Sequence, residues 1–215
     1  KMTMTSWLLG GTTLVVLAIA MVPIVVTWIE SRQAQTVGQL EPVAVSGTIS
    51  HHTAVVIYFS RSGNTALAAR HLANQLHAPI VELKATDYEL GLSGWVHAMK
   101  DARGHHATIT PNTIDLSGVD TVYLGSPIWL YSPAPPIWEF VRANRLDGKA
   151  VVLFNTFNST FEQHFIDEFR DLVIAQGARS FQHRAVKRGR MGQQISPDRM
   201  LQTIDTQWML VPLTQ

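Results

Sequence analysis

Cysteine is absent from all 215 residues of the chain. The protein can therefore form no disulfide, and it has no thiolate with which to bind zinc, hold an iron–sulfur cluster or attack a substrate. Any redox chemistry must use an organic cofactor or a metal held by other ligands.

A strong charge of either sign is also lacking, because 17 lysines and arginines face 16 aspartates and glutamates. Proteins that bind DNA or RNA neutralise phosphates with an excess of cations, so nucleic acid is not an expected partner. The sequence has no Gly-Lys-Ser/Thr phosphate loop, no Gly-x-Gly-x-x-Gly and no Gly-x-Ser-x-Gly. Their absence argues against a nucleoside triphosphatase, a dinucleotide fold and a serine hydrolase. The nine histidines show no ligand spacing with carboxylates, and we expect no metal site.

Charged residues are missing from residues 7–29. This run is rich in Leu, Val, Ile and Ala, and it is long enough to cross a hydrocarbon core of about 30 Å. We predict a transmembrane anchor over residues 1–29 that contacts membrane lipid through residues 7–29. A cleaved signal peptide is the alternative, but the run exceeds the usual apolar core of about 7 to 15 residues and no Ala-x-Ala site stands at its end. Residues 30–53 mix polar and small residues without a period, which predicts a linker.

Short apolar runs alternate with helical patterns over residues 54–207. Five runs suit strands: 54–59, 80–83, 119–124, 150–154 and 180–186. Continuous apolar runs such as 55–59 are typical of strands buried on both faces by crossover helices. We therefore predict one α/β domain with a parallel sheet, followed by a tail over residues 208–215.

A hydroxyl-rich loop follows the first predicted strand and leads into a helical run. It consists of Ser60, Arg61, Ser62, Gly63, Asn64 and Thr65. A loop that enters a helix at the carboxyl end of a strand offers unpaired N–H groups and the positive end of the helix dipole. The residues suit a phosphate monoester, although a turn with a helix cap uses the same residue types.

Two further segments follow central strands and are predicted to reach the same edge of the sheet. The first contains Pro127, Ile128, Trp129, Leu130 and Tyr131. Its aromatic rings offer flat apolar surfaces for a planar ligand, or they pack in the core. The second contains Asn155, Thr156, Phe157 and Asn158. Its amides and hydroxyl are possible donors to the ligand, or helix caps.

The motifs resemble those of one family. Residues 60–65 match every fixed position of the flavodoxin FMN phosphate signature, Thr/Ser-x-Thr/Ser-Gly-Asn-Thr, and residues 125–129 are similar to the Gly-x-Pro-x-Trp segment that lines the flavin ring. The resemblance implies a flavodoxin-like three-layer sandwich with a five-stranded parallel sheet in the order 2-1-3-4-5. It also implies that the three segments bind FMN, and because FMN carries the chemistry, no catalytic side chain is expected.

The expected function is membrane-anchored electron transfer between a reductase and a membrane or soluble acceptor. The alternatives are an FMN-dependent oxidoreductase acting on quinone or another lipid-side substrate, and a non-enzymatic adaptor subunit of a membrane complex. The expected partner is thus a redox protein or a quinone. We expect the inner membrane as the location, with the domain facing the cytoplasm where FMN is made, although Lys and Arg near the anchor weakly favour the opposite face.

A local basic cluster near the C-terminus has three interpretations. It consists of Arg184, Lys187, Arg188 and Arg190. These side chains could face anionic lipid headgroups, a phosphate-bearing cofactor, or only water.

Overall fold

A computed structural model describes the backbone of residues 4–40, 53–190 and 193–209, and side chains from residue 21 to 208 within those ranges. The predicted tail beyond residue 209 and most of the second half of the predicted linker lie outside the described residues.

The centre of the protein is a parallel sheet. Its strands are β1 (Ala54–Tyr58), β2 (Ile80–Glu82), β3 (Thr121–Trp129), β5 (Ala150–Phe157) and β6 (Ser180–Lys187), which lie in the order β2-β1-β3-β5-β6. The short β4 (Ser132–Pro133) pairs antiparallel with the end of β3. The sheet therefore has six strands where five were predicted. The extra strand arises because the chain folds back on β3 immediately after Trp129. Without β4, the order of the parallel strands is the predicted one.

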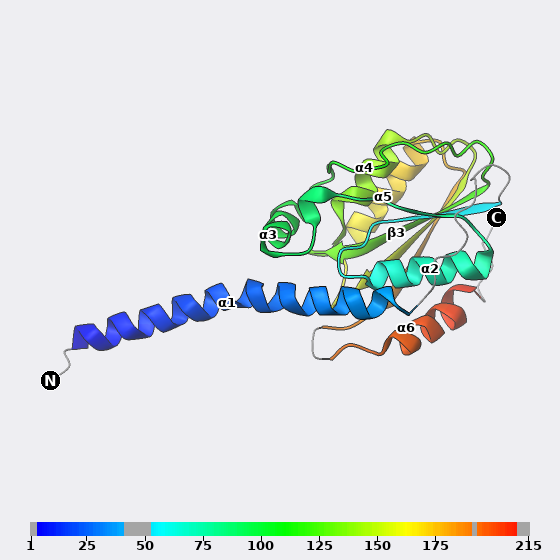
Figure 1. Ribbon diagram of the computed structural model, residues 1–215. Coiled ribbons are helices and arrows are strands. Elements are labelled where there is room, and N and C mark those ends of the chain that lie inside the picture. Colours follow the sequence, from blue (N-terminus) through cyan, green and yellow to red (C-terminus); the bar gives the residue numbers. More distant parts are fainter. Residues whose placement is uncertain (1–3, 41–52, 191–192, 210–215) are drawn as a thin grey trace.

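Helices cover both faces of the sheet, as the burial of β1 requires. All five residues of β1 are buried, and they alternate between two apolar clusters: Val55 and Ile57 in one, Val56 and Tyr58 in the other. The first cluster includes residues of α4 (Pro135–Ala143) and α5 (Gln163–Ala175), and the second includes residues of α2 (Asn64–Leu76) and α6 (Pro197–Ile204). The three layers are visible in Figure 1.

The connection between β2 and β3 contains the short helix η1 (Thr86–Tyr88) and α3 (Leu92–Asp101), and the π-helical turn η2 (Asp205–Met209) follows α6. Trp208 in η2 is 7% exposed and packs in the cluster beneath α2 and α6. The start of the segment predicted as a tail is thus part of the core.

The first helix, α1 (Met4–Gly38), runs without a break through Pro23. Its second half lies beside the domain and its first half projects away from it (Figure 1). Val37 is 1% exposed in the cluster around α2. Residues 30–38, predicted as part of the linker, are instead helical, and they pack on the domain because the apolar side chain of Val37 is buried there.

The membrane prediction receives no support from the described part of the chain. Within the residues that the structure describes, no helix combines the length and the apolar character needed to cross a membrane. The strand order does agree with the predicted fold class, an α/β domain with a parallel sheet of flavodoxin type.

Two central strands extend further than predicted. Residues 125–129 continue β3, and residues 155–157 continue β5, because the two strands go on pairing through Ser126 with Asn155 and Pro127 with Thr156. The two segments that sequence analysis interpreted as loops are therefore largely strand ends, and this pairing holds them beside the end of β1.

Gly125 occupies the point where the three central strands crowd together. A Cβ atom there would lie 2.8 Å from Cβ of Tyr58 and closer still to the ring of Phe154. We expect Gly125→Ala to lower the free energy of unfolding by about 1–3 kcal/mol, the usual cost of overpacking. Urea denaturation measures this change. Gly38→Ala, where no atom lies within 4 Å, is the matched control, and an equally stable Gly125→Ala protein would contradict the crowded register.

Candidate functional site

The loop from Ser60 to Thr65 lies at the carboxyl end of β1, where α2 begins. Gly63 adopts φ +91°, a left-handed conformation that favours glycine, and α2 starts at the next residue. Among the described residues, no backbone N–H from Ser60 to Ala66 donates a hydrogen bond to the protein. A row of unpaired amides at a helix N-terminus is the arrangement that binds phosphate.

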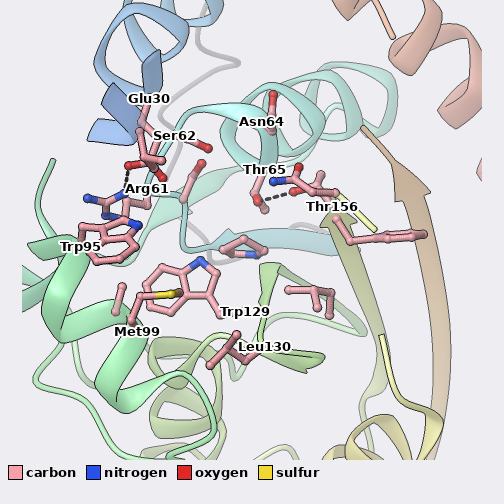
Figure 2. Close-up of a pocket in the computed structure, with 17 residues that line it drawn as sticks. Glu30, Arg61, Ser62, Asn64, Thr65, Trp95, Met99, Trp129, Leu130 and Thr156 are labelled. Carbon is pink, nitrogen blue, oxygen red and sulfur yellow. Dashed lines mark hydrogen bonds and ion pairs between the residues drawn. The ribbon is translucent and has the colours of Figure 1, made fainter. Parts of the chain in front are cut away.

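Two buried threonines close the inner side of this loop. The hydroxyl oxygens of Thr65 and Thr156 lie 2.8 Å apart, and the two residues are only 1% and 4% exposed. Thr65 belongs to α2 and Thr156 to β5, so this hydrogen bond joins the helix to the neighbouring strand end (Figure 2). Both hydroxyls have lone pairs or protons left for a ligand.

Arg61 extends from the loop toward α1. Its guanidinium forms an ion pair with Glu30 of α1 (Figure 2). It also donates a second bond to the Gly91 carbonyl at 3.2 Å. The Arg61 side chain is 4% exposed. Its positive charge is thus largely neutralised by α1, and Arg61 ties the loop, α1 and the start of α3 together.

An aromatic wall lies opposite the loop. Trp129 packs edge-on against Phe59 with ring centres 5.5 Å apart, and against Tyr88 with ring centres 5.2 Å apart. After Trp129 the chain turns through Leu130 and Tyr131, both with positive φ. Leu130 and Tyr131 are exposed, and Arg103 lies over the Tyr131 ring, 5.8 Å from its centre.

Asn155 is fully buried and holds the extended strand ends together. Its side-chain amide donates to the Ser126 carbonyl at 2.8 Å, so its oxygen accepts from His183 Nε2 at 2.9 Å. Burial lowers the pKa of His183 to about 4. His183 is therefore neutral near pH 7, with its proton on Nε2.

Most of the predicted site residues line one pocket. These are Ser60, Arg61, Ser62, Asn64, Thr65, Pro127, Ile128, Trp129, Leu130, Thr156, Phe157 and Asn158. Gly63 forms the turn between two of them. Tyr131 and Asn155 are not among the lining residues: Tyr131 lies on the exposed turn and Asn155 supports the strands.

Sequence analysis missed five lining residues from two other helices: Val26 and Glu30 of α1, and Trp95, Ala98 and Met99 of α3. The spacing of Trp95 and Met99, four residues apart, places both on one helical face, but it does not show which surface that face covers. Glu30 carries no local signal, because its partner Arg61 is distant in sequence.

The residues present fit the group that the resemblance implied. Free amides, the Gly63 turn and the two threonine hydroxyls suit the phosphate of FMN, and the Trp129 wall suits a flat apolar ring. The pocket encloses about 230 Å³, less than the roughly 300–1,000 Å³ of most ligand sites. Part of a flavin would therefore extend beyond the enclosed volume.

A model of the flavodoxin family matches residues 53–173. A candidate flavoprotein from Bacteroides uniformis shares the fold with a TM-score of 0.56 and 20% identity, over 73% of this chain and 99% of that one. A flavoprotein from Lactobacillus acidophilus, solved in complex with FMN, gives a TM-score of 0.50 and 20% identity, over 61% of this chain and 93% of that one. No curated protein matches the sequence.

The neutral His183 makes stability depend on pH. Because its pKa falls from 6.5 to about 4 on folding, the unfolded chain binds more protons between these two values, and stability falls as pH is lowered through this window. We expect a contribution of up to about 1.4 kcal/mol per pH unit. The variant His183→Gln can still donate to Asn155 but does not titrate. Its free energy of unfolding should therefore lack this part of the dependence on pH.

Urea unfolding at several pH values between 4 and 7 measures the difference between the two proteins. The exposed His97 supplies the control variant His97→Gln. Parallel pH profiles for wild type and His183→Gln would show that His183 is not held neutral.

Proposed function

Since this chain belongs to the flavodoxin family, we propose that it binds FMN in the pocket at the carboxyl end of the sheet and works as an electron carrier or oxidoreductase. The observation that carries this proposal is the row of unpaired amides from Ser60 to Ala66, placed at the start of α2 beside the Thr65 and Thr156 hydroxyls. Family membership and the FMN complex of a structural neighbour also support FMN.

When bound, FMN supplies transfer of one or two electrons. The protein's part is to hold and orient the cofactor. The amides of residues 60–66 and the hydroxyl of Thr65 would bind the phosphate. Trp129 would cover the ring, and the exposed Leu130 would border the edge through which electrons leave.

A partner at this edge is either a redox protein or a quinone. Exposed apolar residues near the pocket favour a partner with an apolar surface: Leu92 and Val96 on α3, and Leu130 on the turn after β3. Steady-state turnover with NAD(P)H and a quinone separates an oxidoreductase from a carrier, because a carrier is reduced without turning over quinone. An adaptor subunit would bind FMN weakly or not at all.

The spectrum of the purified protein tests the cofactor, and Thr65→Val tests the phosphate site. We expect flavin absorption that dithionite bleaches, and a dissociation constant for FMN at least about tenfold higher in Thr65→Val, since a hydrogen bond to a charged group is lost. Thr160→Val, an exposed hydroxyl outside the pocket, is the control. A colourless wild-type protein that added FMN does not reconstitute would contradict the proposal.

We further propose that residues 7–29 hold the protein at a membrane, with the domain on the cytoplasmic side. The uncharged sequence of this run supports the proposal. Val26 and Glu30 line the pocket, so no tether separates the end of this run from the site. Because Val26 packs at the pocket, the part of the run before it would be the part that enters the lipid. The pocket would then open close to the membrane surface, which favours a lipid-side substrate.

A charge in the middle of the run tests this attachment. We expect Leu17→Lys to release the protein from membranes during a carbonate wash, since a lysine at a helix centre costs about 2.5–3.5 kcal/mol on insertion. Gln35→Lys, on the exposed side of α1, should stay bound. Protease access to the domain in oriented vesicles reports its side. Release of the wild-type protein by the same wash would contradict membrane insertion.

A further inference from the structure

Arg188 is a buried cation beside the phosphate loop. It follows the last residue of β6 and is 5% exposed. Its Nε donates to the side-chain oxygen of Asn64 at 3.1 Å, whereas its Nη1 is buried without a hydrogen-bond partner. Arg61, by contrast, is paired with Glu30. Of these two arginines at the loop, only Arg188 keeps an uncompensated charge among the described residues.

The position of Arg188 is fixed from both sides. Its backbone N–H donates to the Phe157 carbonyl at 2.8 Å, and its carbonyl accepts from the Ile195 N–H at 3.0 Å. These bonds hold the backbone of Arg188 between the end of β5 and the segment before α6, and the bond from Nε to Asn64 places the buried guanidinium at the start of α2. Within the described ranges no carboxylate forms an ion pair with it.

Desolvation by burial lowers the pKa of Arg188. A buried charge without an anion is strongly unfavourable, and a bound anion would remove that penalty. A negative group that binds close to the unpaired Nη1 of Arg188 would therefore be stabilised by the buried charge.

The start of α2 is where such an anion would bind. Asn64, which accepts from Arg188, is the first residue of this 13-residue helix. The free amides of residues 60–66 lie at the same end. Among the basic residues near the C-terminus, Lys187 and Arg190 are exposed and Arg184 bonds to Gln182, so Arg188 alone is buried at the loop.

We propose that Arg188 neutralises the phosphate of the bound cofactor, together with the amides of the phosphate loop, and thereby makes the site select FMN over riboflavin. This rests on the proposed function. Arg188 does not itself line the pocket, whereas Asn64 does. Arg188 therefore takes no part in electron transfer, and it acts on the phosphate through its buried charge and by holding the Asn64 side chain.

The test compares two flavins that differ only in the phosphate. Dissociation constants for FMN and riboflavin are measured by fluorescence titration on the full chain, for wild type, Arg188→Gln, Arg188→Lys and Arg190→Gln. We expect Arg188→Gln to weaken FMN by about tenfold to a hundredfold and to leave riboflavin within about twofold. Arg188→Lys keeps the charge and should retain part of the preference, and the exposed Arg190→Gln should retain all of it.

Salt provides a second readout on the same proteins. FMN affinity of the wild type should fall with rising NaCl more steeply than that of Arg188→Gln, because a charge contact is lost in the variant. Equal weakening of FMN and riboflavin in Arg188→Gln would show a purely structural role and overturn the proposal, as would an unchanged preference for FMN. A wild-type protein that binds neither flavin would instead contradict the proposed function itself, and this proposal with it.

Discussion

The unequal length of the central strands is the constraint on which the site depends. β1 ends at Tyr58, whereas its neighbour β3 and the next strand, β5, continue to pair with each other as far as Pro127 and Thr156. This leaves a step at the edge of the sheet. The chain leaving β1 turns inside the step, so the loop before α2 has no strand partner for its amides. Trp129 and Thr156 reach the same space because they lie on the longer strands.

The first helix contributes to the same space from outside the sheet. Ala34 and Val37 of α1 pack so closely on the loop that a Cβ at Gly63 would lie 3.3 Å from either residue. The ion pair between Glu30 and Arg61 adds an electrostatic tie beneath that contact. Burying a guanidinium is costly unless an anion and further acceptors satisfy it. Glu30 neutralises the charge of Arg61 and the Gly91 carbonyl accepts a second bond, whereas Nε of Arg61 is buried without a partner among the described residues. The site is thus assembled from the sheet, α1 and α3.

Much of this was predictable from local sequence. Buried runs followed by helical patterns indicated the parallel sheet, and residues 60–65 indicated the start of α2. The extension of β3 and β5 was not predictable, because Pro127 and Asn155 are poor strand residues that hydrogen bonds to distant partners hold in place. The contacts of α1 could not be predicted either, because no residue near Glu30 in the sequence indicates that it pairs with Arg61. The buried state of Arg188 depends on the C-terminal segment, and from sequence it looked like its exposed basic neighbours.

Because α1 is continuous, the rotation of its N-terminal part about the helix axis is fixed relative to the pocket. Each residue of an α-helix is rotated by about 100° from the one before it, and Val26 and Glu30 fix one face of α1 against the pocket. Every backbone position of α1 before Val26 therefore lies at an angle around the helix axis that is set by its distance from Val26. One inserted residue would turn that whole portion by about 100° relative to the pocket, whereas seven would return it almost to the same face. The number of helical residues before Val26 therefore sets how the pocket is oriented relative to the N-terminal end of α1.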